Sequence, residues 1–166
     1  MAITANFGTS LDKDQVIAEI QRISEKQPEL TPRPKLVLEK ALKEGNLALV
    51  QDNDELIGWA LVEPLTKNIS EIGLVFIKPE FRSPAVFDLL MKLVSKRPEK
   101  MLLATYDKSL IRYVQKAWKA EQLSLAKVIW LTRGKFVLKR MDKLSRGAIK
   151  RKIAKSKPLY AIVGER

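Results

Sequence analysis

The sequence contains no cysteine and no histidine. These two absences exclude thiolate nucleophiles, disulfide bonds, zinc sites built from Cys or His, and Ser-His-Asp triads. Any general acid or base must therefore be an Asp, Glu, Tyr or Lys side chain, or a water relay. A carboxylate-only Mg²⁺ site would need clustered acidic residues. Because the sequence shows no such cluster, we predict no metal site.

Long apolar runs are missing too, so no segment of the sequence is expected to span a membrane. The first residues, MAITANFGTS, lack the basic start and apolar core of a secretory signal. We therefore expect a cytoplasmic or nucleoid-facing protein. The 166 residues, of which 46% are hydrophobic and 30% charged, are typical of one globular domain.

Acidic residues are scarce near the C-terminus. Residues 1–132 hold 19 Lys/Arg and 17 Asp/Glu, whereas residues 133–166 hold 12 and 2. This asymmetry favours an acidic partner, either nucleic acid, anionic lipid or the phosphates of a cofactor, over a merely solvated helix face. We predict a domain over residues 1–141 and a basic C-terminal extension, a helix and a strand, over residues 142–166. The residues of the extension expected to contact nucleic acid are Lys143, Arg146, Lys150, Arg151, Lys152 and Lys155.

Hydrophobic periodicity and end signals predict an α+β fold. The predicted helices are amphipathic and cover residues 12–25, 35–44, 84–97, 108–120 and 142–155. The predicted strands cover residues 47–51, 55–64, 69–78, 101–106, 123–132, 135–141 and 159–163. The strand over 101–106 follows a crossover helix, so it should lie parallel to the strand over 69–78. The result is a mixed, mostly antiparallel sheet with one parallel crossover, flanked by helices.

One strand, loop and helix carry a family resemblance. The chain reads Leu-Val-Phe-Ile-Lys-Pro-Glu-Phe-Arg over residues 74–82 and Phe-Asp-Leu-Leu over residues 87–90. Together with the order of elements over residues 9–141, this resembles the GNAT superfamily of acetyl-CoA-dependent N-acetyltransferases. The resemblance implies a GNAT-like fold, acetyl-CoA as substrate and a primary amine as acceptor. It also implies that the cofactor lies against Phe76, Ile77, Arg82, Ser83, Ala85, Val86 and Phe87.

The pyrophosphate loop departs from the family pattern. The family has Arg/Gln-x-x-Gly-x-Gly/Ala, and its two small positions fall here on Ala85 and Phe87. Glycine allows the backbone to approach a ligand closely, whereas the ring of Phe87 stands where the phosphate would approach. Pro84 removes one N–H donor, although Ser83 and Pro84 together are a favoured helix start. We expect Phe87 to pack in the core beneath the sheet.

The resemblance also suggests catalytic residues. Glu71 is the candidate base, acting directly or through water, and its alternative role is a solvated glutamate at a strand end. In the family a tyrosine protonates the departing thiolate. Here Val114 holds that position, Tyr113 is one residue away, and Tyr106 is a second candidate acid.

Two functions remain open. The first is acetyl transfer from acetyl-CoA to an amine, and the alternative is a catalytically weak or inactive GNAT scaffold that binds nucleic acid or another polyanion through its basic extension. A homodimer in which the strand over 159–163 extends a sheet edge is a further expectation. The apolar patterns around Trp59, Trp118 and Trp130 place all three side chains in the core rather than against nucleobases.

Overall fold

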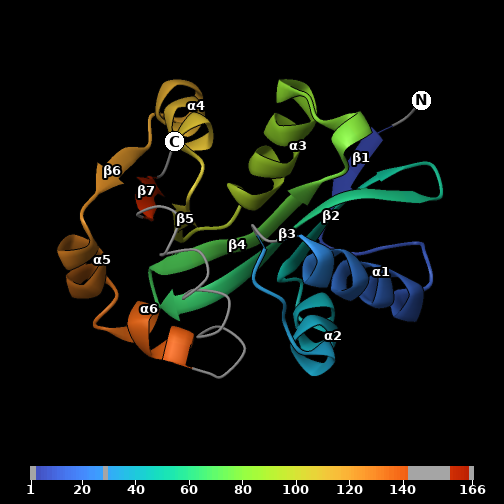
Figure 1. Cartoon of the computed structure of the whole chain (residues 1–166), viewed down its shortest axis with the longest axis horizontal. Helices are drawn as coiled ribbons and strands as arrows, with labels where there is room; N and C mark the ends of the chain where they lie inside the picture. The colour runs from blue at the N-terminus through green and yellow to red at the C-terminus, as the bar shows by residue number, and fades with distance from the viewer. Residues whose placement is uncertain (1–2, 28–29, 142–157, 165–166) are drawn as a thin grey trace. The chain divides into compact units, whose positions relative to one another are not determined.

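The structure is a computed structural model that describes residues 3–27, 30–141 and 158–164. The chain divides into two compact units (Figure 1). Unit 1 comprises Met1–Val62 and Leu74–Arg97, and unit 2 comprises Glu63–Gly73 and Pro98–Arg166. The predicted nucleic-acid residues Lys143, Arg146, Lys150, Arg151, Lys152 and Lys155, and the predicted helix over 142–155, lie outside the described residues.

The strands follow the order β1-β2-β3-β4-β5-β7-β6. Their bounds are β1 Ile3–Asn6, β2 Leu47–Asp52, β3 Glu55–Thr66, β4 Ile69–Ile77, β5 Lys100–Thr105, β6 Glu121–Leu123 and β7 Leu159–Val163. The β4–β5 ladder is parallel, and the β1–β2, β2–β3, β5–β7 and β6–β7 ladders are antiparallel. The predicted α+β fold, with a mixed and mostly antiparallel sheet, is confirmed.

Unit 1 contains three helices, α1 Lys13–Lys26, α2 Lys35–Lys43 and α3 Pro84–Val94. α1 begins where predicted because the Asp12 carboxylate accepts a hydrogen bond from the Gln15 N–H at 2.8 Å. α2 ends before Gly45, whose φ of 66° is accessible to glycine without a Cβ clash.

The strands of unit 1 carry helices on both faces, with α3 on one and α1 and α2 on the other (Figure 1). The core between α1, α2 and the strands includes Trp59, whose ring lies 4.7 Å from that of Phe76, centroid to centroid. Burying aromatic side chains of this size makes a large contribution to the stability of the unit.

Unit 2 contains α4 Lys108–Trp118, α5 Leu125–Leu131, α6 Lys135–Leu138 and the 3₁₀ turn η2 Lys139–Met141. Its parallel ladder runs from Ile69↔Lys100 to Ile72↔Leu103. α5 and α6 share a core with the strands, formed by Leu65, Ile69, Leu102, Leu123, Val128, Phe136 and Tyr160.

The predicted hairpin over residues 123–132 and 135–141 is wrong, because most of this segment is helical. The Ser124 hydroxyl accepts from the Lys127 N–H at 3.2 Å and so caps α5, while Gly134, with φ 74°, begins α6. A short apolar run such as this one does not distinguish a strand from a helix by pattern alone. Helical geometry buries Val128 and turns Trp130 outward, so the core prediction fails for Trp130 and is confirmed for Trp59 and Trp118.

The last predicted strand is confirmed as β7, but it is not an edge strand. β7 pairs with β5 on one side and with β6 on the other. A homodimer formed by adding a second copy to β7 therefore lacks the open edge that it requires. The short strand β1, which pairs with β2, was not predicted because its four residues carry little apolar pattern. No described helix has the length and apolarity needed to cross a membrane.

Candidate functional site

The residues predicted to hold a pyrophosphate lie in unit 1, between β4 and α3. After β4, the chain forms the 3₁₀ turn η1 Pro79–Phe81 and then enters α3 through Ser83. The Ser83 hydroxyl accepts from the Val86 N–H at 3.3 Å, and the Ser83 carbonyl accepts from the Phe87 N–H at 3.1 Å. Ser83 is thus the N-cap that the sequence predicts.

The first turn of α3 has few N–H groups for an anion. A helix start normally leaves its first N–H groups without intrahelical acceptors. Pro84 has no N–H, and the Val86 N–H is bound by Ser83, so the exposed Ala85 keeps the first-turn N–H that helix geometry leaves without an acceptor. This helix start can accept a phosphate oxygen, but with fewer donors than a glycine-rich loop provides.

Arg82 places a positive charge beside this turn. Its side chain is exposed, its Nε donates to the Ile77 carbonyl at 3.0 Å, and its Cζ lies 5.9 Å from the centre of the Phe76 ring. That hydrogen bond uses one of the five N–H donors of a guanidinium group. Arg82, Phe76 and Ile77 are therefore brought together at the end of β4.

Phe87 is half-buried rather than a core residue. The buried side chains of α3 are Val86, Leu90, Met91 and Val94. Residue 87 lies one turn before Leu90 and Met91 on the same helix face, so its partial exposure reflects its place in the first turn of α3 rather than the face it occupies. The prediction that Phe87 packs in the core is corrected accordingly.

Leu74 interrupts the regular backbone of β4. Its φ is 50°, in the left-handed region that bulky side chains rarely adopt, and yet its side chain is buried in the core of unit 1. Such outliers in strands alter the direction of neighbouring N–H groups and are frequent near functional sites.

Glu71 lies in unit 2 and is only 3% exposed, so the solvated reading of this residue is wrong. Arg140 Nη1 donates to Glu71 Oε2 at 3.1 Å, and Arg140 Nη2 pairs with Glu71 Oε1. Lys139 Nζ lies 2.8 Å from Glu63 Oε2 and 3.8 Å from Glu71 Oε2. We call these four residues, Glu63, Glu71, Lys139 and Arg140, the Glu71 cluster.

Aromatic side chains surround the Glu71 cluster. Arg140 Cζ lies 3.5 Å from the centre of the Phe136 ring, a cation–π contact. The Phe136 and Tyr160 rings meet edge to face, with centroids 5.6 Å apart. Burial raises the pKa of Tyr160, with Arg140 acting against it. Burial likewise raises the pKa of Tyr106, which Arg140 again opposes.

The two candidate acids occupy different elements of unit 2. Tyr106 directly follows Thr105, the last residue of β5, and is half-buried. Tyr113 lies on α4 and is also half-buried, whereas its neighbour Val114 is fully buried. The position that carries tyrosine in the family is therefore a core position in this chain.

Sequence reasoning missed Lys139 and Arg140 as partners of Glu71. Their separation from Glu71 is about seventy residues along the chain, and no local pattern joins them. The predicted strand over 135–141 also did not place the Arg140 side chain next to Glu71. Only the helical path of α6 and η2 brings the guanidinium group onto the Glu71 carboxylate.

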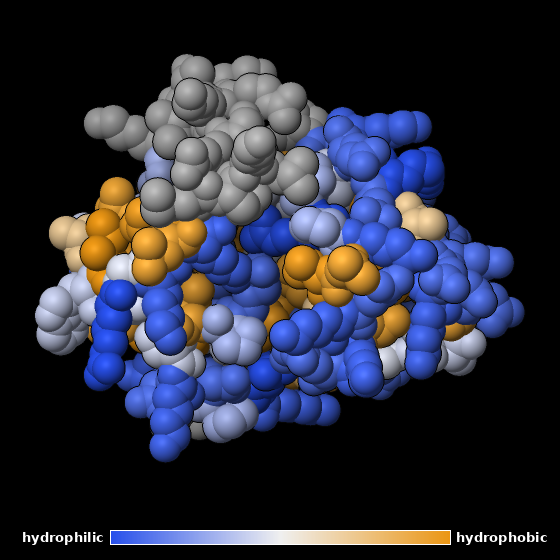
Figure 2. Space-filling model, turned by 90° about the horizontal axis from the view of Figure 1, so that it is seen from below, coloured by the Kyte–Doolittle hydropathy of each residue, from blue (hydrophilic) through white to orange (hydrophobic). Residues whose placement is uncertain are grey.

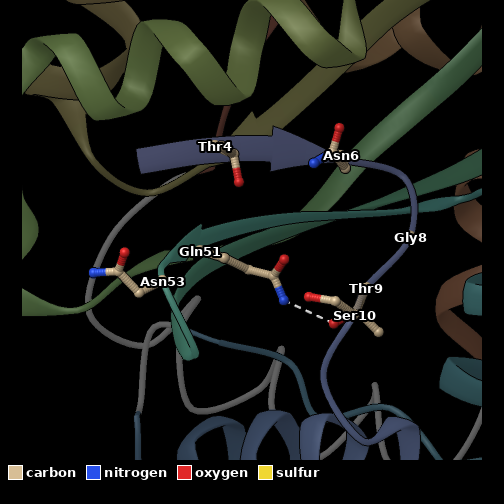
Figure 3. A pocket seen from close by; sticks show the side chains of 7 residues that line it. All are labelled: Thr4, Asn6, Gly8, Thr9, Ser10, Gln51 and Asn53. Carbon is tan, nitrogen blue, oxygen red and sulfur yellow. Dashed lines mark hydrogen bonds between the residues drawn. The ribbon is translucent and has the colours of Figure 1, made fainter. Parts of the chain in front are cut away.

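Unit 1 also has a depression of about 430 Å³ near its N-terminal strand (Figure 3). It is lined by Thr4, Asn6, Gly8, Thr9, Ser10, Gln51 and Asn53. Gln51 Nε2 donates to Thr9 Oγ1 at 2.7 Å across it. The lining is polar and uncharged, and it includes none of the predicted site residues.

The raised pKa of Tyr160 predicts a loss of stability at alkaline pH. Below about pH 10 the phenol is protonated in both states. Above it the unfolded chain loses this proton while the folded state retains it, so stability falls as pH rises. Tyr160→Phe should therefore show a smaller decrease in Tm between about pH 9 and pH 11 than the unmodified protein. Circular dichroism melts at each pH measure this, and equal decreases would contradict the prediction.

Comparison with known proteins bears on the fold. No family model matches the chain, and no curated protein does. Among solved structures, N-acetylglutamate synthase from Neisseria gonorrhoeae, in complex with coenzyme A and N-acetyl-glutamate, superposes with a TM-score of 0.63 at 13% identity over 99% of this chain. This chain spans about a third of that enzyme, 36% of its length.

Two shorter proteins match along their whole length. A Mycobacterium tuberculosis protein solved in complex with CoA has a TM-score of 0.62 and 11% identity over 99% of this chain and 100% of its own. A GNAT-family acetyltransferase from Bacillus cereus has a TM-score of 0.62 and 11% identity over 100% and 99%. The chain therefore has the GNAT fold.

Proposed function

We propose that this protein transfers an acetyl group from acetyl-CoA to a primary amine. The observation that carries the proposal is the continuous run in unit 1 from β4, through Arg82, into the N-capped helix α3. This run presents a cation and a helix N-terminus to one place, which suits a pyrophosphate. Coenzyme A in the structures of the Neisseria gonorrhoeae and Mycobacterium tuberculosis proteins supports the choice of ligand.

The proposed reaction is a direct transfer. The amine nitrogen attacks the thioester carbonyl, the C–N bond forms, the C–S bond breaks, the amine loses a proton and the thiolate gains one. A backbone N–H of β4 near Ile77 would polarise the carbonyl oxygen. Tyr106 would protonate the thiolate, since a tyrosine phenol carries its proton at neutral pH and burial raises the pKa of Tyr106 further.

The structure changes the role that we propose for Glu71. Both of its carboxylate oxygens accept from Arg140, and its side chain is only 3% exposed, so taking the amine proton on Glu71 would compete with this ion pair. We therefore propose that water removes the proton and that Glu71 acts as a positioning residue through the Glu71 cluster. Tyr113 stays a prediction as the alternative acid.

The helix start predicts weak but specific binding of the cofactor. Acetyl-CoA at tenfold its Kd should stabilise the folded protein by about 1.4 kcal/mol and raise its Tm. Arg82→Ala should weaken binding about fivefold, because it removes one exposed charge near the phosphates. Thermal shift and isothermal titration calorimetry with acetyl-CoA measure both effects.

Arg22→Ala is the matched control, because Arg22 is an exposed arginine of unit 1 on α1. It should bind acetyl-CoA as the unmodified protein does. Absence of any Tm shift with millimolar acetyl-CoA would refute the proposed function. If Arg82→Ala and Arg22→Ala weaken the binding of acetyl-CoA equally, then Arg82 contributes only through the net charge of the protein and does not contact the ligand at α3.

A further inference from the structure

The helices α5 and α6 of unit 2 expose an unusual number of large hydrophobic side chains. They are Leu125, Ile129, Trp130, Val137 and Leu138, and we call them the α5–α6 face. Trp130 is 76% exposed and Leu138 is 64% exposed. Figure 2 shows hydrophobic atoms gathered where α5 and α6 lie, at the left of the view, with hydrophilic side chains beside them.

The core of unit 2 does not account for this face. Val128 of α5 and Phe136 of α6 already supply the buried contacts of these helices. The exposed side chains lie outside this core, and no described element of unit 2 covers them. Exposed apolar clusters rimmed by polar residues typically mark surfaces that bind a protein or a membrane.

The charges beside the face are mainly positive. Lys127, Arg133 and Lys135 are exposed on the same segment, and Lys127 pairs with Glu121 at 2.6 Å. Residues 133–166 as a whole hold 12 Lys/Arg against 2 Asp/Glu. A second copy of the chain docked on this face would bring like charges together, which opposes self-association.

The composition of the face also distinguishes between anionic partners. Nucleic acid presents phosphates and stacked bases, and aliphatic side chains such as Leu125, Ile129 and Leu138 have little to gain from either. An anionic bilayer offers both an apolar layer and negative headgroups. Trp is the side chain enriched at this boundary, and Lys or Arg beside it contact lipid phosphates.

We propose that the α5–α6 face binds the surface of an anionic lipid bilayer. The apolar side chains enter the boundary between headgroups and acyl chains, and Arg133 and Lys135 lie against the headgroups. The binding is peripheral, and it is independent of acetyl transfer.

Sedimentation of the full chain with vesicles tests this inference. The probes are phosphatidylcholine vesicles with and without about 30% phosphatidylglycerol. We expect binding to the anionic vesicles, with a blue shift of tryptophan emission. Trp130→Ser with Leu138→Ser should lower the partition coefficient at least about tenfold. Arg133→Gln with Lys135→Gln should lower the partition coefficient about 20-fold at low salt. The same pair of substitutions should have a smaller effect at high salt, because salt screens the attraction to the headgroups.

Matched controls lie on unit 1. Leu36 on α2 is 77% exposed, and Leu36→Ser should leave binding unchanged. The exposed pair Lys43→Gln with Lys92→Gln removes the same amount of charge from unit 1.

Three results would overturn the inference. The first is no binding to anionic vesicles, or equal binding by the face variants and the controls. The second is that the protein binds duplex DNA but not vesicles, and that Trp130→Ser with Leu138→Ser abolishes the binding to DNA. The third is a dimer, detected by light scattering, that the same substitutions dissociate.

Discussion

Glu71→Gln is expected to lower the free energy of unfolding by about 3 kcal/mol, because it removes the buried carboxylate of an ion pair with the partly buried Arg140. The amide cannot neutralise Arg140, whose guanidinium group pairs with both carboxylate oxygens of Glu71. Lys139 also loses a nearby negative charge. A partly buried cation left without its counter-charge is more harmful than loss of the whole pair. Urea denaturation followed by circular dichroism measures this change.

The chain offers a surface pair as control. Glu121 pairs with Lys127, and both side chains are about half exposed. Glu121→Gln should therefore change stability by less than about 1 kcal/mol. The double variant Glu71→Gln with Arg140→Gln should lose less than the sum of its single variants, since they share one interaction. Additive losses, or equal effects of Glu71→Gln and Glu121→Gln, would show that the Glu71 cluster is not a stabilising unit.

Tyr106→Phe is expected to lower kcat about 100-fold while changing KM for acetyl-CoA little, if the phenol protonates the departing thiolate. Tyr106 follows the last residue of β5, and ligands of parallel strands tend to bind beyond their carboxyl ends. The substitution keeps the ring and removes only the hydroxyl, so packing is preserved. Release of the free CoA thiol, with the fastest of a panel of primary amines as acceptor, gives kcat and KM.

Tyr113→Phe is the comparison. It also removes a single hydroxyl from a half-buried side chain of unit 2, but from α4. We expect a change of less than about threefold in kcat. A large loss in Tyr113→Phe with none in Tyr106→Phe would assign the acid to α4, as the family resemblance suggests. A loss of stability in Tyr106→Phe that matches its loss of activity would point to a structural role instead.

The helices of unit 1 could be predicted from the sequence, because their signals lie within a few residues of each other. Asp12 caps α1 through Gln15, and Ser83 caps α3 through Val86. The departure at Phe87 could also be seen, although its half-buried position could not. Helix periodicity identifies the buried stripe, but how far the stripe stays covered toward the helix end depends on the neighbouring elements.

The region after β5 could be predicted less well. The apolar run in α5 fits a strand as well as a helix. The choice between them depends on contacts with segments that are distant in the sequence. β7 pairs with β5 on one side and with β6 on the other, an order of strands that the sequence did not predict. Strand order depends on contacts between distant segments, which no local window contains.

The sequence by itself determined the class of the fold, the caps of its main helices, the parallel crossover and the chemistry excluded by the absence of cysteine and histidine. Those features follow from backbone geometry and residue type at short range. The tertiary structure decided that Glu71 is buried against Arg140, that Trp130 is exposed, and that β7 lies inside the sheet. Each of these depends on the burial free energy of residues far apart in the chain, which is settled only when the whole unit packs.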